Sequence, residues 1–560
     1  MAYGDSPTTW TGQSRIRGGS ESMRMFLLTF SLVGLQFCWG TEQTYATPYL
    51  LALGLSKGAM SLVWVAGPLS GLIMQPIIGM ISDKSTSKYG RRRPFMIGGT
   101  VAVAVCLLIL GWAIEIVEWF VPGTGAEVVE RRRALTIRLA IFDIYVLDFV
   151  INIAQATCRA LVVDALPVEK QQTGGAWITR MVGLGHILVF GFGALDLNYW
   201  LPSMFGDTQF KKVCAFAAFM MVFTFSVNCW AVTEKVLVVD PRNTTDNDES
   251  LLAIIKQIYS RALHVPQRIQ YICNVQFWSW IGWFPLMFYG STWVGEIYLR
   301  HGLDGIPPSS TDALSQVGRA GSTALIIHST IGFITAIILP TLVTSPGDDE
   351  KAHSFTPRPP KGLEAVANKV PLFKPHLLDV WTFGCAMFSS CLVFAPVVKS
   401  VRFATFLMAA AGIPSAIAGF ASATLIGVEI NRLGSTLPTS GPKGTRTPNS
   451  RRSSNDFEMD EPSLLRRPSQ SGAHSQSGEL SGIYLGILNI YTTIPQFVGT
   501  FISFVVFRIL EPGKSPELAK DAHPDDVHST EGLSGIGVCL FIGSMSSVMA
   551  ALATRKLKER

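Results

Sequence analysis

Twelve apolar segments recur along this chain, and they constrain its fold more than any other feature. A helix of about 20 apolar residues is long enough to cross the hydrocarbon core of a bilayer. Only 15% of the 560 residues are charged, whereas about a quarter of the residues in soluble domains carry a charge. The sequence therefore predicts an all-α polytopic membrane protein. The predicted spans are residues 25–51, 60–82, 95–117, 138–163, 173–195, 213–232, 268–289, 314–343, 379–398, 402–428, 480–507 and 532–553.

A charged stretch at residues 233–267 divides the predicted spans into six and six. This is the layout of the major facilitator fold, which binds its substrate near the bilayer midplane between two halves. We therefore expect 12 transmembrane helices in two six-helix halves. The expected parts are an N-terminal tail (1–24), a first half (25–232), a central loop (233–267), a second half (268–553) and a C-terminal tail (554–560). Within the second half, residues 431–478 are rich in Ser, Pro, Gly and Arg, which predicts a disordered loop.

Charge and motif content exclude several function classes. Lys and Arg gather on the side of the membrane that holds both termini, so the positive-inside rule predicts cytoplasmic tails and loops there. The net charge of +6 comes without a basic stripe interleaved with aromatic residues, so no nucleic-acid partner is expected. We find no enzyme motif and no metal-ligand spacing, so we expect a non-enzymatic protein without metal or cofactor. Its surroundings are the lipid bilayer, and the sequence leaves the oligomeric state open.

A polar stripe marks the fourth predicted span. Asn152, Gln155 and Arg159 follow Asp148 at offsets that keep all four side chains within about 60° on one helix face. An ionised side chain at membrane depth costs roughly 2.5 to 3.5 kcal/mol, so such residues usually serve a function. The alternative is a structural ion pair, but a helix separates Asp148 from Arg159 by roughly 16 Å. The stripe therefore predicts one wall of a polar cavity that is lined by several helices.

Two further ionisable residues are expected near this cavity. Glu42 lies in the first predicted span at a depth similar to that of Asp148. Two carboxylates in one desolvated cavity favour proton binding, because burial and like charge both disfavour the ionised form. The alternative is that Glu42 pairs with a cation, for which Arg319 at the start of the eighth span is the candidate. Arg319 has its own alternative as an arginine at a helix end that reaches toward the interface.

A charged cluster is expected at the cytoplasmic ends of three spans. An acid at the end of one helix and an arginine cluster opening the next can latch helix ends together and release them when the halves rock. Positive-inside topology alone explains the arginines but not the acids or the glycine. The predicted members of this cytoplasmic gate are Asp83, Gly90, Arg91, Arg92, Arg93 and Asp164.

Several stretches in both halves resemble one transporter group. The sequence resembles the sucrose/H+ symporter group of the glycoside-pentoside-hexuronide cation symporters, in the major facilitator superfamily, and it is most similar to the fungal α-glucoside and sucrose carrier branch. The fourth-span stripe carries part of this resemblance. The other matching stretches are G-L-Q-F-C-W-G-T-E-Q-T-Y-A-T-P-Y-L (34–50), G-P-L-S-G-L-I-M-Q-P-I-I-G (67–79), Y-G-R-R-R-P-F (89–95), W-F-P (283–285), R-A-G (319–321) and I-P-Q (494–496).

The resemblance implies proton-coupled import of a disaccharide, with protons as the coupling ion. The resemblance implies that Asp148 acts in proton coupling and that Arg159 and Arg319 act in transport. We expect Glu42 to take part in proton coupling as well, because of its similar depth. The substrate-binding residues expected on this basis are Asn152, Gln155, Arg159 and Arg319.

Two departures weaken a plant-like preference for sucrose. Lys57 stands where plant carriers have a histidine, and Ile151 where they have a second asparagine. An uncoupled facilitator and a non-transporting sugar sensor remain as alternatives. The plasma membrane is the expected location, with the vacuolar membrane as the alternative.

Overall fold

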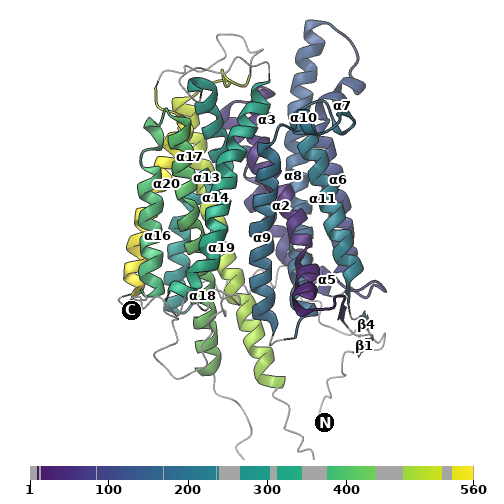
Figure 1. Cartoon of the computed structure of the whole chain (residues 1–560), viewed down its shortest axis with the longest axis vertical. Helices are drawn as coiled ribbons and strands as arrows, with labels where there is room; N and C mark the ends of the chain where they lie inside the picture. Colours follow the sequence, from purple (N-terminus) through teal and green to yellow (C-terminus); the bar gives the residue numbers. More distant parts are fainter. Residues whose placement is uncertain are drawn as a thin grey trace, which may run out of the picture.

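The helices of the chain stand side by side in one upright bundle (Figure 1). The computed structural model describes residues 9–11, 14–83, 85–167, 170–234, 236–238, 265–302, 312–343, 375–436, 471–519 and 532–558. The first helix begins and the last helix ends at the lower end of the bundle in Figure 1, which we call the terminal end. The opposite end is called the far end.

The first half is built from the N-terminal helices. Its first span is a continuous helical path with a π-helical turn, η1, in its middle. The elements are α1 (Glu21–Thr29), α2 (Ser31–Thr41), η1 (Glu42–Ala46), α3 (Thr47–Ala52), α4 (Lys57–Val63), α5 (Ala66–Asp83), α6 (Arg93–Gly111), α7 (Ala113–Phe120), α8 (Ala126–Ala165), α9 (Gln171–Ala194), α10 (Leu197–Trp200), η3 (Ser203–Phe205) and α11 (Gln209–Ala231). Within this half, α8 packs against α5 and α6, and α11 packs against α2 and α6.

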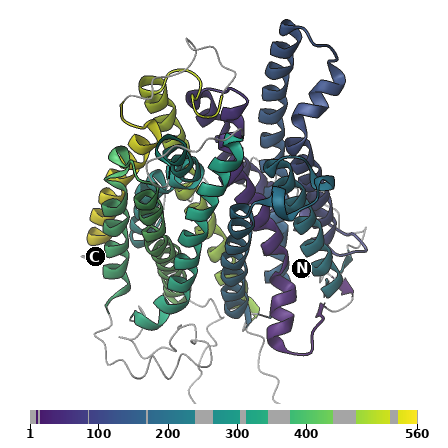
Figure 2. The same cartoon turned by 45° about the horizontal axis from the view of Figure 1, so that its top comes forward.

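The second half repeats this arrangement with the C-terminal helices. Its elements are α13 (Gln267–His301), α14 (Ala313–Leu342), α16 (Leu377–Leu392), η5 (Ala395–Val397), α17 (Val401–Ala410), α18 (Gly412–Thr436), α19 (Ser471–Leu510) and α20 (Gly535–Lys558). Here α20 packs against α13 and α16, while α14 packs against α13 and α18. The halves meet where α14 packs on α9 and α19 packs on α4, and Figure 2 shows them side by side.

The multi-span helical fold predicted from the sequence is confirmed. Among the described residues, ten helical segments are long and apolar enough to cross a membrane. The other two predicted spans correspond to α8 and α13, which have 40 and 35 residues. Both are long enough to span a bilayer, and both carry buried charged side chains such as Asp148 and Glu296.

Two short antiparallel ladders add to the predicted all-α architecture. Strand β1 (Thr9–Thr11) pairs with β4 (Val236–Val238), and β2 (Arg15–Ile16) pairs with β3 (Val232–Thr233). The ladders tie the segment before α1 to the segment after α11. They begin the predicted central loop with strands, while residues 239–264 of that loop lie outside the described part of the chain. Likewise α18 and α19 extend into the loop predicted at 431–478, of which residues 437–470 are not described.

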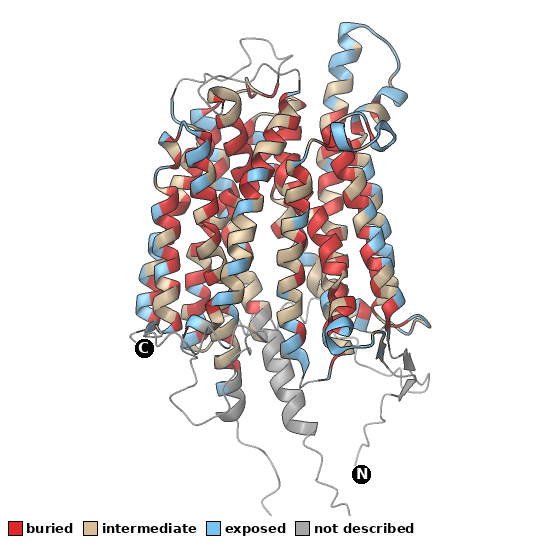
Figure 3. Cartoon of the chain, viewed as in Figure 1, coloured by how far each residue is buried: buried red, intermediate tan, exposed pale blue. Residues whose placement is uncertain are grey.

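Buried residues run through the interior of the bundle, and exposed apolar side chains cover its outside (Figure 3). An apolar exterior is what a lipid-facing surface requires, because hydrocarbon offers no hydrogen bonds. The polar groups inside the bundle therefore stand out, and among the described residues α8 carries two buried carboxylates, Asp143 and Asp148.

Candidate functional site

Asp148 occupies the middle of α8 and is completely buried. Neither of its carboxylate oxygens has a hydrogen-bond partner among the described residues. Gly67 of α5 lies opposite, and a Cβ atom built on this glycine would stand 4.0 Å from both oxygens. The missing side chain of Gly67 therefore leaves α5 close to the carboxylate without filling the space in front of it.

Asn152 lies one turn after Asp148 and connects α8 to α5. Its Nδ2 donates to Ser70 Oγ at 2.9 Å, and its Oδ1 accepts from Gln75 Nε2 at 3.2 Å. The same Nδ2 donates to the carbonyl oxygen of Asp148 at 2.9 Å. These polar groups fix the side of the stripe that faces α5.

Exposure increases along the stripe toward the terminal end. Asp148 and Asn152 are buried, Gln155 is half-buried, and Arg159 is exposed. Trp39 donates from Nε1 to Gln155 Oε1 at 3.0 Å, so α2 borders the same space. Among the described residues Arg159 has no ion-pair partner, although it lies within the membrane helix α8, six residues before that helix ends. The predicted polar wall therefore opens toward the terminal end and is sealed at Asp148.

Two further buried carboxylates lie in the first half. Glu42 opens the π-helical turn η1, is 1% exposed, and has no hydrogen-bond partner for either oxygen in the described part of the chain. Asp143 of α8 is 4% exposed, and its Oδ2 is likewise unpartnered. Sequence reasoning missed Asp143 because it lies off the helix face of Asp148, although a simple search for acids within predicted spans finds it.

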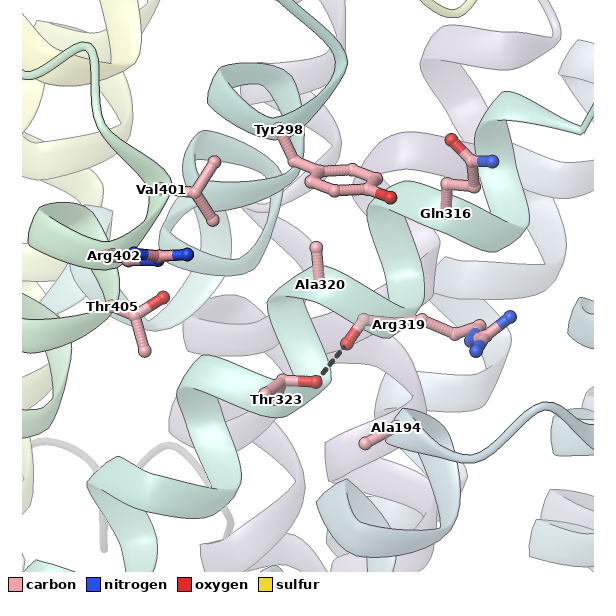
Figure 4. A pocket seen from close by; sticks show the side chains of 9 residues that line it. All are labelled: Ala194, Tyr298, Gln316, Arg319, Ala320, Thr323, Val401, Arg402 and Thr405. Carbon is pink, nitrogen blue, oxygen red and sulfur yellow. Dashed lines mark hydrogen bonds between the residues drawn. The ribbon is translucent and has the colours of Figure 1, made fainter. Parts of the chain in front are cut away.

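Arg319 of α14 pairs with Asp196 and not with Glu42. Its Nη1 lies 2.9 Å from Asp196 Oδ2, and both side chains are partly exposed. The pair joins the two halves because Asp196 follows α9. Arg319 also borders a cavity of about 550 Å³, in which Figure 4 shows it on the α14 wall with Arg402 on the facing wall. The full lining is Ala194, Tyr298, Gln316, Arg319, Ala320, Thr323, Val401, Arg402 and Thr405.

The structure brings the predicted cytoplasmic-gate residues together at the terminal end. Arg91 donates to both oxygens of Asp164 at 2.5 and 3.0 Å, and Arg92 Nε donates to the same carboxylate at 2.9 Å. Arg92 also pairs with Asp83. All of these residues belong to the first half, so this cluster fastens α5, α6 and α8 to one another.

Glu234 completes this cluster and was missed from the sequence. Its oxygens accept from the backbone N–H groups of Arg92 and Arg93, each at 2.9 Å. Burial raises the pKa of Glu234 above its usual value, although these N–H groups oppose the shift. Gly90 has a φ of +107°, and a Cβ atom there would stand 2.8 Å from the Glu234 side chain. Arg93 donates to the carbonyl oxygen of Cys229, so α11 and the segment after it join the cluster.

A second ionic cluster fastens the two halves at the far end. Lys57, at the start of α4, is completely buried and lies 2.7 Å from Glu296 of α13 and 2.9 Å from Glu511 after α19. Arg300 Nε donates to Glu517 at 2.6 Å and lies within 4.0 Å of Glu296 and Glu511. We call these five residues the far-end cluster. Sequence reasoning did not foresee it, because its members come from three segments that are separated by more than 200 residues: Lys57, Glu296 with Arg300, and Glu511 with Glu517.

Hydrogen bonds between the halves surround the far-end cluster. Thr47 Oγ1 donates to the carbonyl oxygen of Phe288 at 3.0 Å, and Ser291 Oγ donates to that of Gln43 at 2.8 Å. The second bond reaches the π-helical turn that carries Glu42. The halves are therefore joined at the far end by both ionic and hydrogen-bonded contacts.

The described residues contain no cluster of His, Cys, Asp or Glu that is arranged to hold a metal ion.

Sequence comparison relates the chain to sugar carriers. A profile of the family described as "MFS/sugar transport protein" matches residues 29–259. The general alpha-glucoside permease of Schizosaccharomyces pombe is 34% identical over 327 residues, which cover 58% of this chain and 56% of the relative. The sucrose transport protein SUC4 of Arabidopsis thaliana is 27% identical over 336 residues, which cover 57% and 63%. The matched region thus spans less than two thirds of these relatives.

Comparison with solved structures identifies the fold. One solved structure, reported as giving structural insights into substrate recognition in proton dependent oligopeptide transporters, aligns with a TM-score of 0.52 at 9% identity. The alignment covers 95% of this chain and 98% of the other chain. A bacterial homolog of the human lysosomal transporter Spinster aligns with a TM-score of 0.51 at 13% identity, over 97% and 99%. At these identities the likeness concerns the fold alone, which is that of major facilitator transporters.

Proposed function

Because residues 29–259 match the model of the family described as "MFS/sugar transport protein", we propose that the chain imports a disaccharide together with protons by alternating access. The substrate is sucrose or a maltose-type α-glucoside, since the relatives include an α-glucoside permease and sucrose transport proteins. The terminal end faces the cytosol and the far end faces the outside. The membrane is the plasma membrane, with the vacuolar membrane as the alternative.

The observation that carries proton coupling is the environment of Asp148. A buried carboxylate without any partner is costly to ionise inside a membrane protein, so it favours the protonated form. Asp148 meets this description, and Asn152 and Gln155 continue its stripe with amides that bind hydroxyl groups. Binding of a proton and binding of a sugar therefore concern neighbouring side chains.

The proposed cycle couples the two events through charge. When the cavity is open to the outside, Asp148 takes up a proton, and sugar hydroxyls bind to the stripe and an arginine. Neutral Asp148 lowers the cost of closing the cavity, whereas a charged, unpartnered Asp148 resists closure. After inward opening, the sugar leaves and the proton passes to the cytosol.

The two ionic clusters serve different parts of this cycle. The far-end cluster joins the halves in the state described here, so it closes the outer side and must separate for sugar to enter. The cluster of Asp83, Gly90, Arg91, Arg92, Arg93 and Asp164 holds the inner helix ends of the first half in one rigid arrangement, and we propose that it acts as part of the cytoplasmic gate.

The external pH of a weakly buffered suspension of cells that express the chain tests this function. Addition of sucrose or maltose should make the medium more alkaline, because each sugar carries a proton inward. Entry of labelled sugar without a pH change would support an uncoupled facilitator. Absence of both signals, with the chain present at the surface, would support a sugar sensor.

A further inference from the structure

Asp148 is the only acidic group that the cycle above uses, but other acidic side chains of the first half also have buried oxygens. We define a row of groups in the first half by one shared property. Each of its acidic side chains has a buried oxygen without a hydrogen-bond partner among the described residues, and the row also includes one tyrosine with such a hydroxyl. Unpartnered buried oxygens are ordinarily satisfied by internal water. The atoms are Glu115 Oε2, Tyr49 Oη, Asp143 Oδ2, both oxygens of Glu42 and both oxygens of Asp148.

These groups are arranged in sequence along the bundle. Glu115 lies on α7 at the far end (Figure 1). Tyr49 lies seven residues after Glu42, which places it roughly 10 Å nearer the far end. Asp143 precedes Asp148 by five residues, so it lies roughly 7 Å nearer the far end. Glu115 thus lies at the far end, Tyr49 lies nearer the far end than Glu42, and Asp143 lies nearer the far end than Asp148.

Neighbouring members are close enough to interact electrostatically. Tyr49 and Glu115 meet beside α11, where Phe210 stacks on Tyr49 with ring centroids 4.4 Å apart and the adjacent Lys211 pairs with Glu115. Asp143 lies within electrostatic range of Tyr49 and Glu42, and Asp148 lies within electrostatic range of Glu42. Five residues turn a helix by about 140° from its starting direction, so Asp143 faces away from α5 and the sugar stripe. It faces the thiols of Cys106 on α6 and Cys214 on α11 instead.

The charges along the row change from its outer mouth to its three inner carboxylates, and only at the inner carboxylates do they favour binding of protons. Lys211 stands at its outer mouth, where it is paired with Glu115 and Asp207. Within the part of the chain that the structure describes, no Lys or Arg forms an ion pair with Asp143, Glu42 or Asp148. Three buried carboxylates without a counter-charge repel one another, so the group holds protons in place of three negative charges.

We propose that this row is a proton path inside the first half, separate from the route of the sugar, and that Asp143 is a proton-binding residue of it. The inference rests on the proposed function, and it gives protons a second route to Asp148 besides the sugar cavity. A protonated Asp143 passes its proton through water to the carboxylate of Glu42, and Glu42 passes it to Asp148. Each donor becomes a carboxylate as its acceptor becomes neutral, and Asp143 is refilled from the outer solution past Tyr49 and Glu115.

Two conservative variants test the path, together with a matched control. Asp143→Asn removes the titrating group, and Tyr49→Phe removes only a hydroxyl. Tyr289→Phe is the control, because Tyr289 is a completely buried tyrosine with an unpartnered hydroxyl in the second half. The readouts are sugar-driven alkalinisation of the medium and exchange of labelled for unlabelled sugar, which moves no net proton.

The expected result is a split between the two readouts. Asp143→Asn should lose sugar-driven alkalinisation while it retains exchange, and Tyr49→Phe should slow alkalinisation alone, whereas Tyr289→Phe should match the wild type in both. Wild-type alkalinisation rates in both Asp143→Asn and Tyr49→Phe would overturn the path. If Asp143→Asn fails to fold and shows no exchange, Tyr49→Phe decides the matter. If the wild type itself moves sugar without protons, the proposed function fails first, and that outcome is distinct.

Discussion

Gly67 faces the carboxylate of Asp148 at 4.0 Å, measured from the position that a Cβ atom would take. This close approach of α5 leaves Asp148 buried and its two oxygens unpartnered. Such a carboxylate is stable as a neutral acid and unstable as an isolated charge. The pair of residues thus creates an environment in which the protonation state of one side chain governs whether the helices can pack.

Asp148→Asn should abolish proton-driven accumulation of sugar. Asparagine has the shape of a neutral aspartic acid but cannot release a proton, so packing against Gly67 is kept while coupling is lost. The measurement is the inside-to-outside ratio of labelled sugar under an inward proton gradient. Asp379→Asn, at an exposed pair with Lys558, is the control and should accumulate normally. Concentrative uptake in Asp148→Asn would reject the assignment.

Lys57→Met should shift the protein toward the state that is open to the outside. Removing one partner of a buried ion pair typically costs about 3 to 5 kcal/mol, and here it leaves Glu296 and Glu511 without Lys57. Thr292 lies one turn before Glu296 and is buried. In a Thr292→Cys background, Lys57→Met should increase labelling by an impermeant thiol reagent added from outside.

A charge exchange provides the control for this effect. The double variant Lys57→Glu with Glu296→Lys restores one opposite pair and should recover part of the protection. Unchanged labelling in Lys57→Met would mean that the far-end cluster does not hold the halves together.

Acid should weaken the far-end cluster. Burial by itself raises the pKa of Glu517, but the charges of Arg300 and Lys57 outweigh it and lower that pKa below the usual 4.5. A lowered pKa means that Glu517 stabilises the folded cluster above pH 4.5, and that this contribution is lost as the pH falls through the lowered value. Labelling of Thr292→Cys, relative to that of an exposed cysteine at the same pH, should therefore rise below pH 4.5. Glu517→Gln should show raised labelling at neutral pH and a smaller response to acid, and an identical acid response in both proteins would contradict this role.

Arg319→Lys should impair transport with little effect on stability. The pair with Asp196 is about two-fifths exposed on each side, and exposed pairs contribute less than about 1 kcal/mol. Lysine loses the planar fork of arginine, which matters if Arg319 binds sugar hydroxyls or changes partner during the cycle. Asp196→Asn separates the two roles. A raised KM in Arg319→Lys alone supports substrate binding, whereas equal defects in both variants support a role through the pair, and unchanged kinetics would make Arg319 structural.

Gly90→Ala should destabilise the terminal-end cluster. Its φ of +107° lies in the left-handed region, which costs a residue with a Cβ atom roughly 1 to 2 kcal/mol, and the new methyl group would displace Glu234. Gly98→Ala is the matched control, because that helical glycine has open space around it. Thermal unfolding in detergent should show a lower midpoint for Gly90→Ala only, and equal midpoints would exclude a special role for Gly90.

The membrane fold was predictable because apolar length is a local property of the sequence. All twelve predicted spans have a helical counterpart, including α8, whose charged side chains set it apart from an ordinary span. The strands β1 to β4 were not predictable, because each has only two or three residues and pairs with a segment more than 200 residues away. Their stability depends on partners that no local pattern reveals.

The candidate site likewise has one part that local sequence spacing predicts and another part that depends on distant residues. The spacing of Asp148 to Arg159 placed four side chains on one face, and the structure adds a gradient of exposure that spacing alone does not contain. The alternative in which Arg319 pairs with Glu42 is not found, and Arg319 pairs with Asp196 instead. Sequence distance could not discriminate between these two carboxylates. Lys57 was noted only as a departure from a related pattern, since its buried carboxylate partners come from the other half.

The π-helical turn η1 inserts one additional residue into the first membrane helix, and its effect is a change of phase. An extra residue rotates everything beyond it by about 100° relative to an uninterrupted α-helix. Before the turn, α2 packs on α9 and α11 of its own half; after it, α3 packs on α13 and α14 of the other half. One helix therefore packs on both halves, and this single wide turn sets the angle between the face that its inner segment presents to its own half and the face that its outer segment presents to the other half.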